Sequence, residues 1–167
     1  MANYVSQCRT NYFQIKDLDA FKNDLELLGI KLDTWQSRYP EFILDEPENK
    51  PAGTIALFSY EGWPSLDEDS ICFSLGIDDN EDISLLPLGQ LLAKVETIFD
   101  LVALHLADES IAVFEEVGFE KMRYLYGAAI AVNSKGERRE VLLGNIYDLA
   151  KELLPEGSSA AISTATY

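Results

Sequence analysis

The segment SIAVFEEVGFEKMRYLYGAAIAVNSKGERREVLL, residues 110–143, decides the fold. Its parts 110–117 and 124–132 are rich in β-branched and aromatic residues, and the short connection GFEKMR between them is typical of a hairpin. The turn NSKGE follows, with Gly136 at the position where a type I turn with a bulge requires a positive φ. Residues 137–143 then return as a third strand. Three consecutive strands with short connections predict an antiparallel sheet.

The rest of the chain adds more strands and a few helices. Further strands are expected at 9–16, 31–35, 41–44, 54–60 and 70–75, and helices at 18–28, 87–106 and 146–154. The first helix is the best defined, because Asp17 can cap its start and Gly29 its end. This order predicts an α+β fold, an antiparallel sheet with about three helices packed mainly on one face. We expect one compact domain over 1–155 and a flexible or loosely docked tail over 156–167.

Composition excludes several protein classes. The chain has 167 residues, of which 47% are hydrophobic, so it can build a core without disulfides or metal. Its N-terminus lacks the basic and apolar regions of a signal peptide. The longest apolar segment, 85–106, is interrupted by charged side chains and does not predict a membrane span. With two cysteines, Cys8 and Cys72, we expect reduced thiols and a cytoplasmic location.

The charge of the chain is concentrated in its middle. Residues 41–120 contain 19 acids and two bases, a net charge of −17, whereas the other 87 residues sum to +1. Such a field repels nucleic acid and membranes and attracts a basic protein. Ordinary solubility is the alternative explanation. The acidic residues expected to contact a partner are Glu48, Glu61, Asp67, Glu68, Asp69, Asp78, Asp79, Glu81 and Asp82, and Trp35 and Trp63 are candidate aromatic anchors.

The residues of common catalytic and metal sites are scarce. His105 is the one histidine, expected to be packed or to cap a helix, and no sequence feature brings it near a cysteine or serine nucleophile. The segment starting at Asp78 opens like a calcium-binding EF-hand loop, but Ile83 and Gly89 stand where glycine and a bidentate glutamate are required. We therefore expect no catalytic residue, no metal and no cofactor. An unrecognised enzyme is the third-ranked alternative.

A polar cluster in the β-hairpin connection permits two interpretations. Glu120, Lys121 and Arg123 are either the charged corner of a hairpin or part of a site. In the second interpretation, Arg123 with Tyr12, Tyr124 and Tyr126 lines a pocket on an open sheet face. The protein would then be a small-molecule- or peptide-binding α+β module.

Two stretches carry a resemblance. NYVSQCRTNYFQIKDLDAF, near the N-terminus, and VGFEKMRYLYGAAIAVNSKGE with the later NIYDLAKEL resemble an uncharacterised family of small acidic proteins of bacterial plasmids, integrative elements and phages. The resemblance covers about a third of the chain and implies no catalytic residues. It implies a mobile-element context, in which small acidic proteins often inhibit host defence, some by imitating nucleic acid. We therefore expect a non-enzymatic anti-restriction or anti-CRISPR inhibitor that binds a basic, nucleic-acid-binding host protein.

Overall fold

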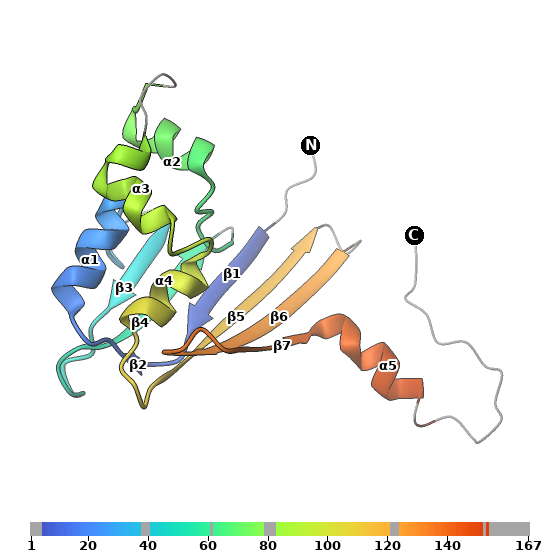
Figure 1. The fold of residues 1–167 in the computed structure, drawn as a ribbon. Coiled ribbons are helices and arrows are strands. Elements are labelled where there is room, and N and C mark those ends of the chain that lie inside the picture. The colour runs from blue at the N-terminus through green and yellow to red at the C-terminus, as the bar shows by residue number, and fades with distance from the viewer. Residues whose placement is uncertain are drawn as a thin grey trace.

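The computed structural model describes residues 5–37, 41–60, 62–78, 83–120, 124–151 and 153. Its strands are β1 (Val5–Thr10), β2 (Phe13–Gln14), β3 (Phe42–Asp45), β4 (Thr54–Tyr60), β5 (Ile111–Glu120), β6 (Tyr124–Asn133) and β7 (Arg138–Leu142). They form one sheet in the order β2-β4-β1-β5-β6-β7, and β3 also pairs with β4. Each strand pairing is antiparallel, so the predicted α+β class is confirmed (Figure 1).

The three-strand unit at 110–143 forms as the sequence predicts. β5 pairs with β6 over ten residue pairs, and β6 pairs with β7 through five. Gly136 has a φ of +77° in the turn between β6 and β7. The Asn133 side chain accepts hydrogen bonds from the backbone N–H groups of Lys135 and Glu137, which fixes this turn.

The helices are more numerous than expected. The described residues contain five α-helices, α1 (Leu18–Leu27), α2 (Glu68–Leu75), α3 (Pro87–Leu92), α4 (Ile98–His105) and α5 (Ile146–Lys151), and two short 3₁₀ turns, η1 (Ile83–Leu85) and η2 (Leu143–Asn145). α1 agrees with its prediction, because Asp17 caps it by accepting from the Ala20 N–H and Gly29 follows it with a φ of +72°. The expected tail, 156–167, lies outside the described residues.

The prediction of a strand at 70–75 is wrong, because this segment belongs to helix α2. Asp67 accepts the backbone N–H of Ser70 as an N-cap, and Gly76 ends the helix in the left-handed conformation with a φ of +68°. These two caps outweigh the β-propensity of Ile71, Cys72 and Phe73. The strand expected at 31–35 is also wrong, since this segment contributes a single bridge, between Asp33 and Ile43.

The long helix expected at 87–106 is two helices. α3 ends at Leu92, and α4 starts after Thr97, whose hydroxyl accepts from the Asp100 N–H while the Asp100 carboxylate accepts from the Thr97 N–H. This capping box starts a new helix inside a continuous apolar pattern. Burial acts to raise the pKa of Asp100, but hydrogen bonds from Thr97 and Arg138 outweigh it and lower that pKa below its ordinary value.

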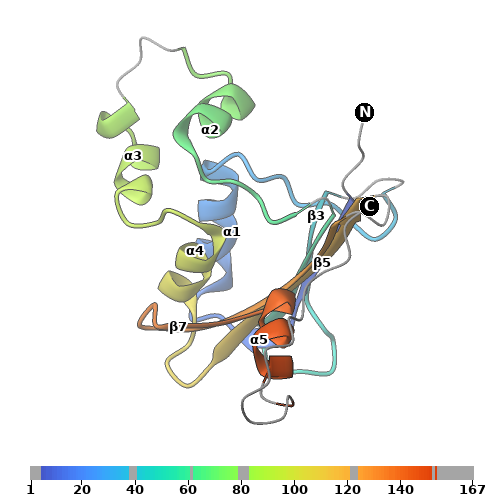
Figure 2. The same cartoon turned by 90° about the vertical axis from the view of Figure 1, so that its right-hand side faces the viewer.

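The core lies between one face of the sheet and helices α1 to α4. Phe21 and Leu25 of α1, Leu101 of α4 and Leu57 of β4 are completely buried, and Phe114 of β5 is 1% exposed. Figure 2 shows these four helices on one side of the sheet and α5 on the other. The second face of the sheet is therefore free of α1 to α4.

Candidate functional site

Among the predicted acidic residues that the structure describes, those at the start of helix α2 lie closest together. Asp67 caps the helix, and Glu68 and Asp69 occupy its first turn, where negative charge is favoured by the helix dipole. Hydrogen bonds from Ser65 and Ser70 lower the pKa of Asp67 from 3.8 to about 2, so this carboxylate is charged at every physiological pH.

Phe73 is the least expected feature of this helix. Its side chain is 90% exposed, although phenylalanine is normally buried. Asp69 precedes it by four residues and therefore lies on the same face of α2. Asp78, which is also exposed, follows two residues after Gly76. We call Asp67, Glu68, Asp69, Phe73 and Asp78 the α2 surface.

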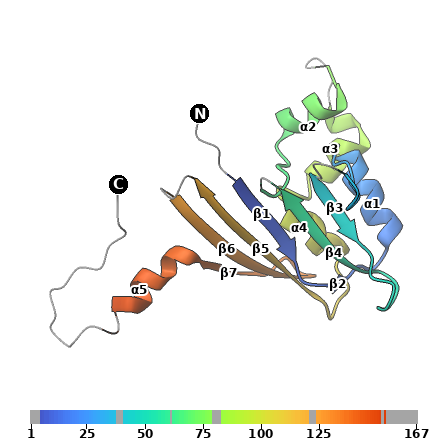
Figure 3. The ribbon, with the colours of Figure 1, turned by 180° about the vertical axis from the view of Figure 1, so that it is seen from behind.

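The remaining predicted carboxylates do not all join this surface. Glu48 belongs to the turn between β3 and β4, and Figures 1 and 3 show this turn at the end of the sheet opposite α2. Glu61, Asp79, Glu81 and Asp82 lie outside the described residues. The described acidic residues that were predicted to contact a partner therefore lie in two separate places. Four of these five residues belong to the α2 surface, and Glu48 does not.

The two tryptophans differ from Phe73 in their surroundings. Trp63 is half-buried, with its ring edge-on to Phe114 at 5.0 Å between centroids. Trp35 is 55% exposed and packs edge-on against Phe58 at 4.8 Å. Both therefore have intramolecular aromatic partners, and Phe73 presents a larger fraction of its side chain to solvent than either Trp35 or Trp63.

The polar cluster of the β5–β6 connection is only partly described. Glu120 and Tyr124 are cross-strand partners that close the hairpin, whereas Lys121 and Arg123 lie outside the described residues. Tyr126 pairs with the buried Gly118 and thus lies on the helix-covered side, beside Trp63 and Phe114. Burial, followed by the negative charges of Glu116 and Glu140, raises the pKa of Tyr126.

The expectation that Tyr126 lines a pocket on the open sheet face is therefore wrong. Strand residues alternate between the two faces, so the register of β6 assigns Leu125, Gly127 and Ala129 to the open face and Tyr126 to the other. Tyr12 is 43% exposed, and its hydroxyl donates to Asp45 at 2.7 Å, the carboxylate that also accepts from Trp35 Nε1. That hydrogen bond, more than burial, raises the pKa of Tyr12.

The open face nevertheless contains a groove of about 800 Å³, which we call the sheet groove. Trp35 and Phe58 form one wall, and Leu143, Ile146 and Leu149 form the other. Its floor includes Val117, Gly127, Ala129 and the side chains of Arg9 and Glu115. Arg9 Nε lies 2.6 Å from Glu115 Oε2, so the charges on the floor neutralise each other.

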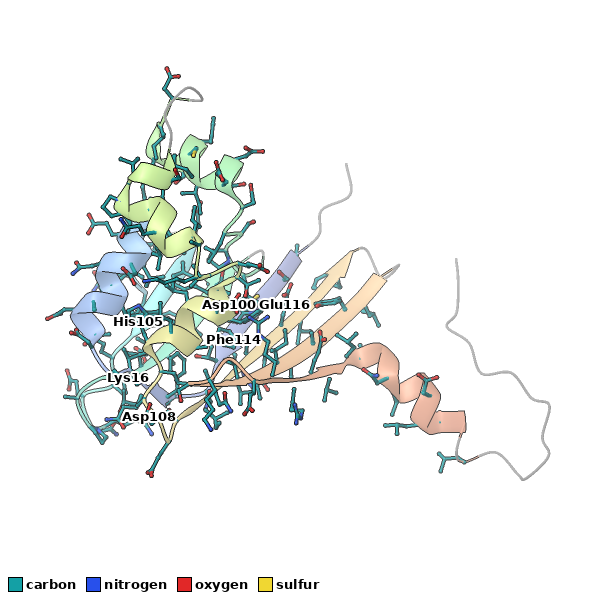
Figure 4. All side chains as sticks on the ribbon, viewed as in Figure 1. Lys16, Asp100, His105, Asp108, Phe114 and Glu116 are labelled. Atoms are coloured by element: carbon teal, nitrogen blue, oxygen red, sulfur yellow. The ribbon has the colours of Figure 1, made fainter. Side chains whose placement is uncertain are left out.

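His105 occupies a structural position. It ends α4, and its Nε2 lies 2.8 Å from Asp24 Oδ2 of α1, with the Phe21 ring edge-on at 5.4 Å (Figure 4). Cys8 is a buried residue of β1, where desolvation, followed by the charge of Glu116, raises the pKa of its thiol to about 12. A thiol in this environment is a poor nucleophile.

The described ranges of the chain contain no group of three or more histidine, cysteine or acidic side chains positioned to hold a metal ion. Across the same ranges, no helix has the length and apolar character needed to cross a bilayer.

The sequence contained a signal for helix α2, although the β-propensity of the same segment favoured a strand. The segment DEDSICFSLG begins with an N-capping acid and ends with a C-capping glycine, a pattern typical of a short helix. Helix α2 directs Ile71 into the core. Phe73, two residues later, lies about 200° further around the helix axis and therefore faces solvent.

Comparison with known proteins adds no relative. No protein family, no curated protein and no solved structure matches this chain.

Proposed function

We propose that this protein is a non-enzymatic interaction protein that presents the α2 surface to a basic, nucleic-acid-binding surface of another protein. One observation carries the proposal: Phe73, 90% exposed, stands on a helix whose first turn is acidic. Binding interfaces commonly combine a central aromatic anchor with charged residues around it.

The two kinds of side chain have separate tasks. The carboxylates attract a basic surface over a distance of about 10 Å, and the net charge of −17 in residues 41–120 increases the rate of encounter. Phe73 then supplies contact energy, because removing its ring from water on binding stabilises the complex by about 1.5–3 kcal/mol. Electrostatics alone would give a complex that forms fast but is weak.

The proposed partner is a restriction or CRISPR nuclease. Such enzymes hold nucleic acid on lysine- and arginine-rich surfaces. Carboxylates near α2 would occupy positions that phosphates otherwise take, and the protein would inhibit by excluding nucleic acid. The resemblance to proteins of mobile elements supports this class of partner. The charge of −16 opposes direct binding of the chain to nucleic acid.

The test is a cleavage assay with a panel of purified restriction and CRISPR nucleases. The wild-type protein is expected to inhibit at least one enzyme of the panel. Phe73→Ala and the double change Glu68→Gln with Asp69→Asn should each weaken that inhibition at least tenfold. Asp67 is left unchanged because it caps the helix.

A matched control removes the same charge elsewhere. Glu48→Gln with Glu109→Gln neutralises two exposed acids in turns at the end of the sheet opposite α2 (Figure 3). This variant should inhibit like the wild type. Equal loss in both double variants would mean that net charge matters and the α2 surface does not, and inhibition of no nuclease would refute the proposed partner class.

A further inference from the structure

Helix α5 has apolar side chains with little to pack on. Its six residues extend away from the rest of the molecule in Figures 1 and 3, and its principal contact is with η2, the turn directly before it. A helix this short is not stable in water without a packing surface. Ile146 is 55% exposed, Leu149 is 56% exposed and Leu153 is 87% exposed.

Two of these side chains form a stripe with Leu143. Ile146 and Leu149 are three residues apart, which is the spacing of one helix face, and Leu143 precedes Ile146 by three residues. Leu143 is itself 52% exposed. The stripe extends the wall of the sheet groove beyond the sheet, so the groove and the helix form one continuous apolar surface.

The strands beside the helix expose further apolar side chains on the same face. Val117, Phe119, Leu125 and Val141 are each more than half exposed and share the open face by register. Gly127 and Ala129 line the groove between these residues. Because their side chains are absent or small, a helix can approach the strand backbone closely there. An apolar surface of this composition resembles the core of a subunit interface.

Charge identifies the occupant. Residues 124–151 contain four bases and three acids, a net charge of +1, although the chain as a whole carries −16. The groove floor is neutral because Arg9 pairs with Glu115. Of the acidic segment 41–120, the groove is lined by Phe58, Ser59, Tyr60, Glu115, Glu116 and Val117 only, and Glu115 is paired with Arg9. Two copies that meet through the groove, β6, β7 and α5 therefore bring few carboxylates of that segment together. A basic partner would find no excess of carboxylates in this region.

We propose that the sheet groove and α5 form the interface of a homodimer. The α5 helix of a second copy lies in the sheet groove, antiparallel to the first α5 about a two-fold axis, and the first α5 occupies the second groove in the same way. Such an interface is isologous, since each copy supplies both the helix and the groove.

The interface is separate from the α2 surface. α2 lies in the helical layer, on the opposite side of the sheet from α5 (Figure 2). A dimer therefore leaves two α2 surfaces exposed, and a partner with two basic sites would bind more tightly than a single site predicts. The dimer does not depend on the identity of that partner.

Sedimentation equilibrium of the full chain tests the proposal. The wild type is expected to have twice the 18.7 kDa mass of the chain at micromolar concentration. Leu149→Glu should give a monomer, with at least a hundredfold weaker self-association and a circular dichroism spectrum that loses no more helix signal than the six residues of α5 contribute. Phe73→Glu is the matched control, because it also introduces an acid at an exposed apolar position and should remain dimeric. A monomeric wild type, or a dimeric Leu149→Glu, would overturn the proposal.

A disulfide measurement tests the two-fold arrangement independently of Leu149→Glu. In a Cys72→Ser background, Leu149→Cys places a thiol at the middle of α5, where two antiparallel helices bring equivalent positions together. Mild oxidation should link two chains through position 149, whereas Phe73→Cys in the same background should give no linked dimer. Linkage at both positions at equal rates, or no linkage through position 149, would contradict the arrangement.

Discussion

Asp67 is the residue whose ionisation most directly supports α2. Its pKa is lowered to about 2 in the folded protein from an ordinary 3.8, through hydrogen bonds from Ser65 and Ser70. A lowered pKa means that the charged form stabilises the fold. This contribution is complete above the unfolded-state pKa and is lost as the pH falls from about 4 to about 2.

The substitution Asp67→Asn isolates this effect. Asparagine is also a good N-cap, so the variant keeps the hydrogen bond but has no charge to titrate. The melting temperature of the wild type should exceed that of Asp67→Asn above about pH 4, and the difference should shrink as the pH is lowered to about 2. Thermal unfolding followed by circular dichroism at several pH values measures this. A difference independent of pH would show that the charge is unimportant.

Individual residues were predictable from sequence only where local chemistry decides. The caps Asp17 and Gly29 and the positive φ of Gly136 follow from neighbours a few residues away. The exposure of Phe73 and the orientation of Tyr126 depend on helix phase and strand register, respectively, which tertiary packing sets. Sequence spacing alone therefore could not show which of the predicted acidic residues share a surface.

At the scale of elements, the turn before α3 makes a specific steric demand. A Cβ added at Gly89 would lie 2.2 Å from the backbone oxygen of Ile83, in η1. Gly89→Ala must therefore push η1 and α3 apart, and we expect it to lower the free energy of unfolding by about 1–3 kcal/mol. Urea denaturation measures the change.

Gly144→Ala is the control for this substitution. No atom lies within 4 Å of a Cβ added there, so its free energy of unfolding should change by less than about 0.5 kcal/mol. If Gly89→Ala changed the free energy of unfolding as little as Gly144→Ala, the close contact between η1 and Gly89 of α3 would be incorrect.

Two of the errors in the predicted elements have a common physical cause. In 70–75 and 87–106 the hydrophobic pattern suggested a strand and one long helix, but capping side chains started helices at Asp67 and Thr97. A cap stabilises a helix by about 1 kcal/mol, enough to decide a short segment with an ambiguous pattern. The strands of the 110–143 unit have long, consistent patterns and were predicted correctly.

At the scale of the whole molecule, the sequence was sufficient for the α+β class and for the antiparallel pairing of β5, β6 and β7. It was not sufficient for the order of β1, β3 and β4, because contacts such as that between Gln7 and Tyr60 join residues far apart in the chain. The resulting arrangement separates two unlike surfaces. The α2 surface is acidic with one aromatic side chain, and the sheet groove is apolar and neutral.

The central claim is that the α2 surface contacts a basic protein, and photo-crosslinking in bacterial cells tests it most directly. A photoreactive benzoyl-phenylalanine in place of Phe73 retains an aromatic side chain at the proposed anchor, and the same residue in place of Glu48 is the control. We predict that position 73 links the protein to a basic, nucleic-acid-binding protein and that position 48 does not. No product from position 73, the same product from both positions, or a linked protein that is itself acidic would contradict the account.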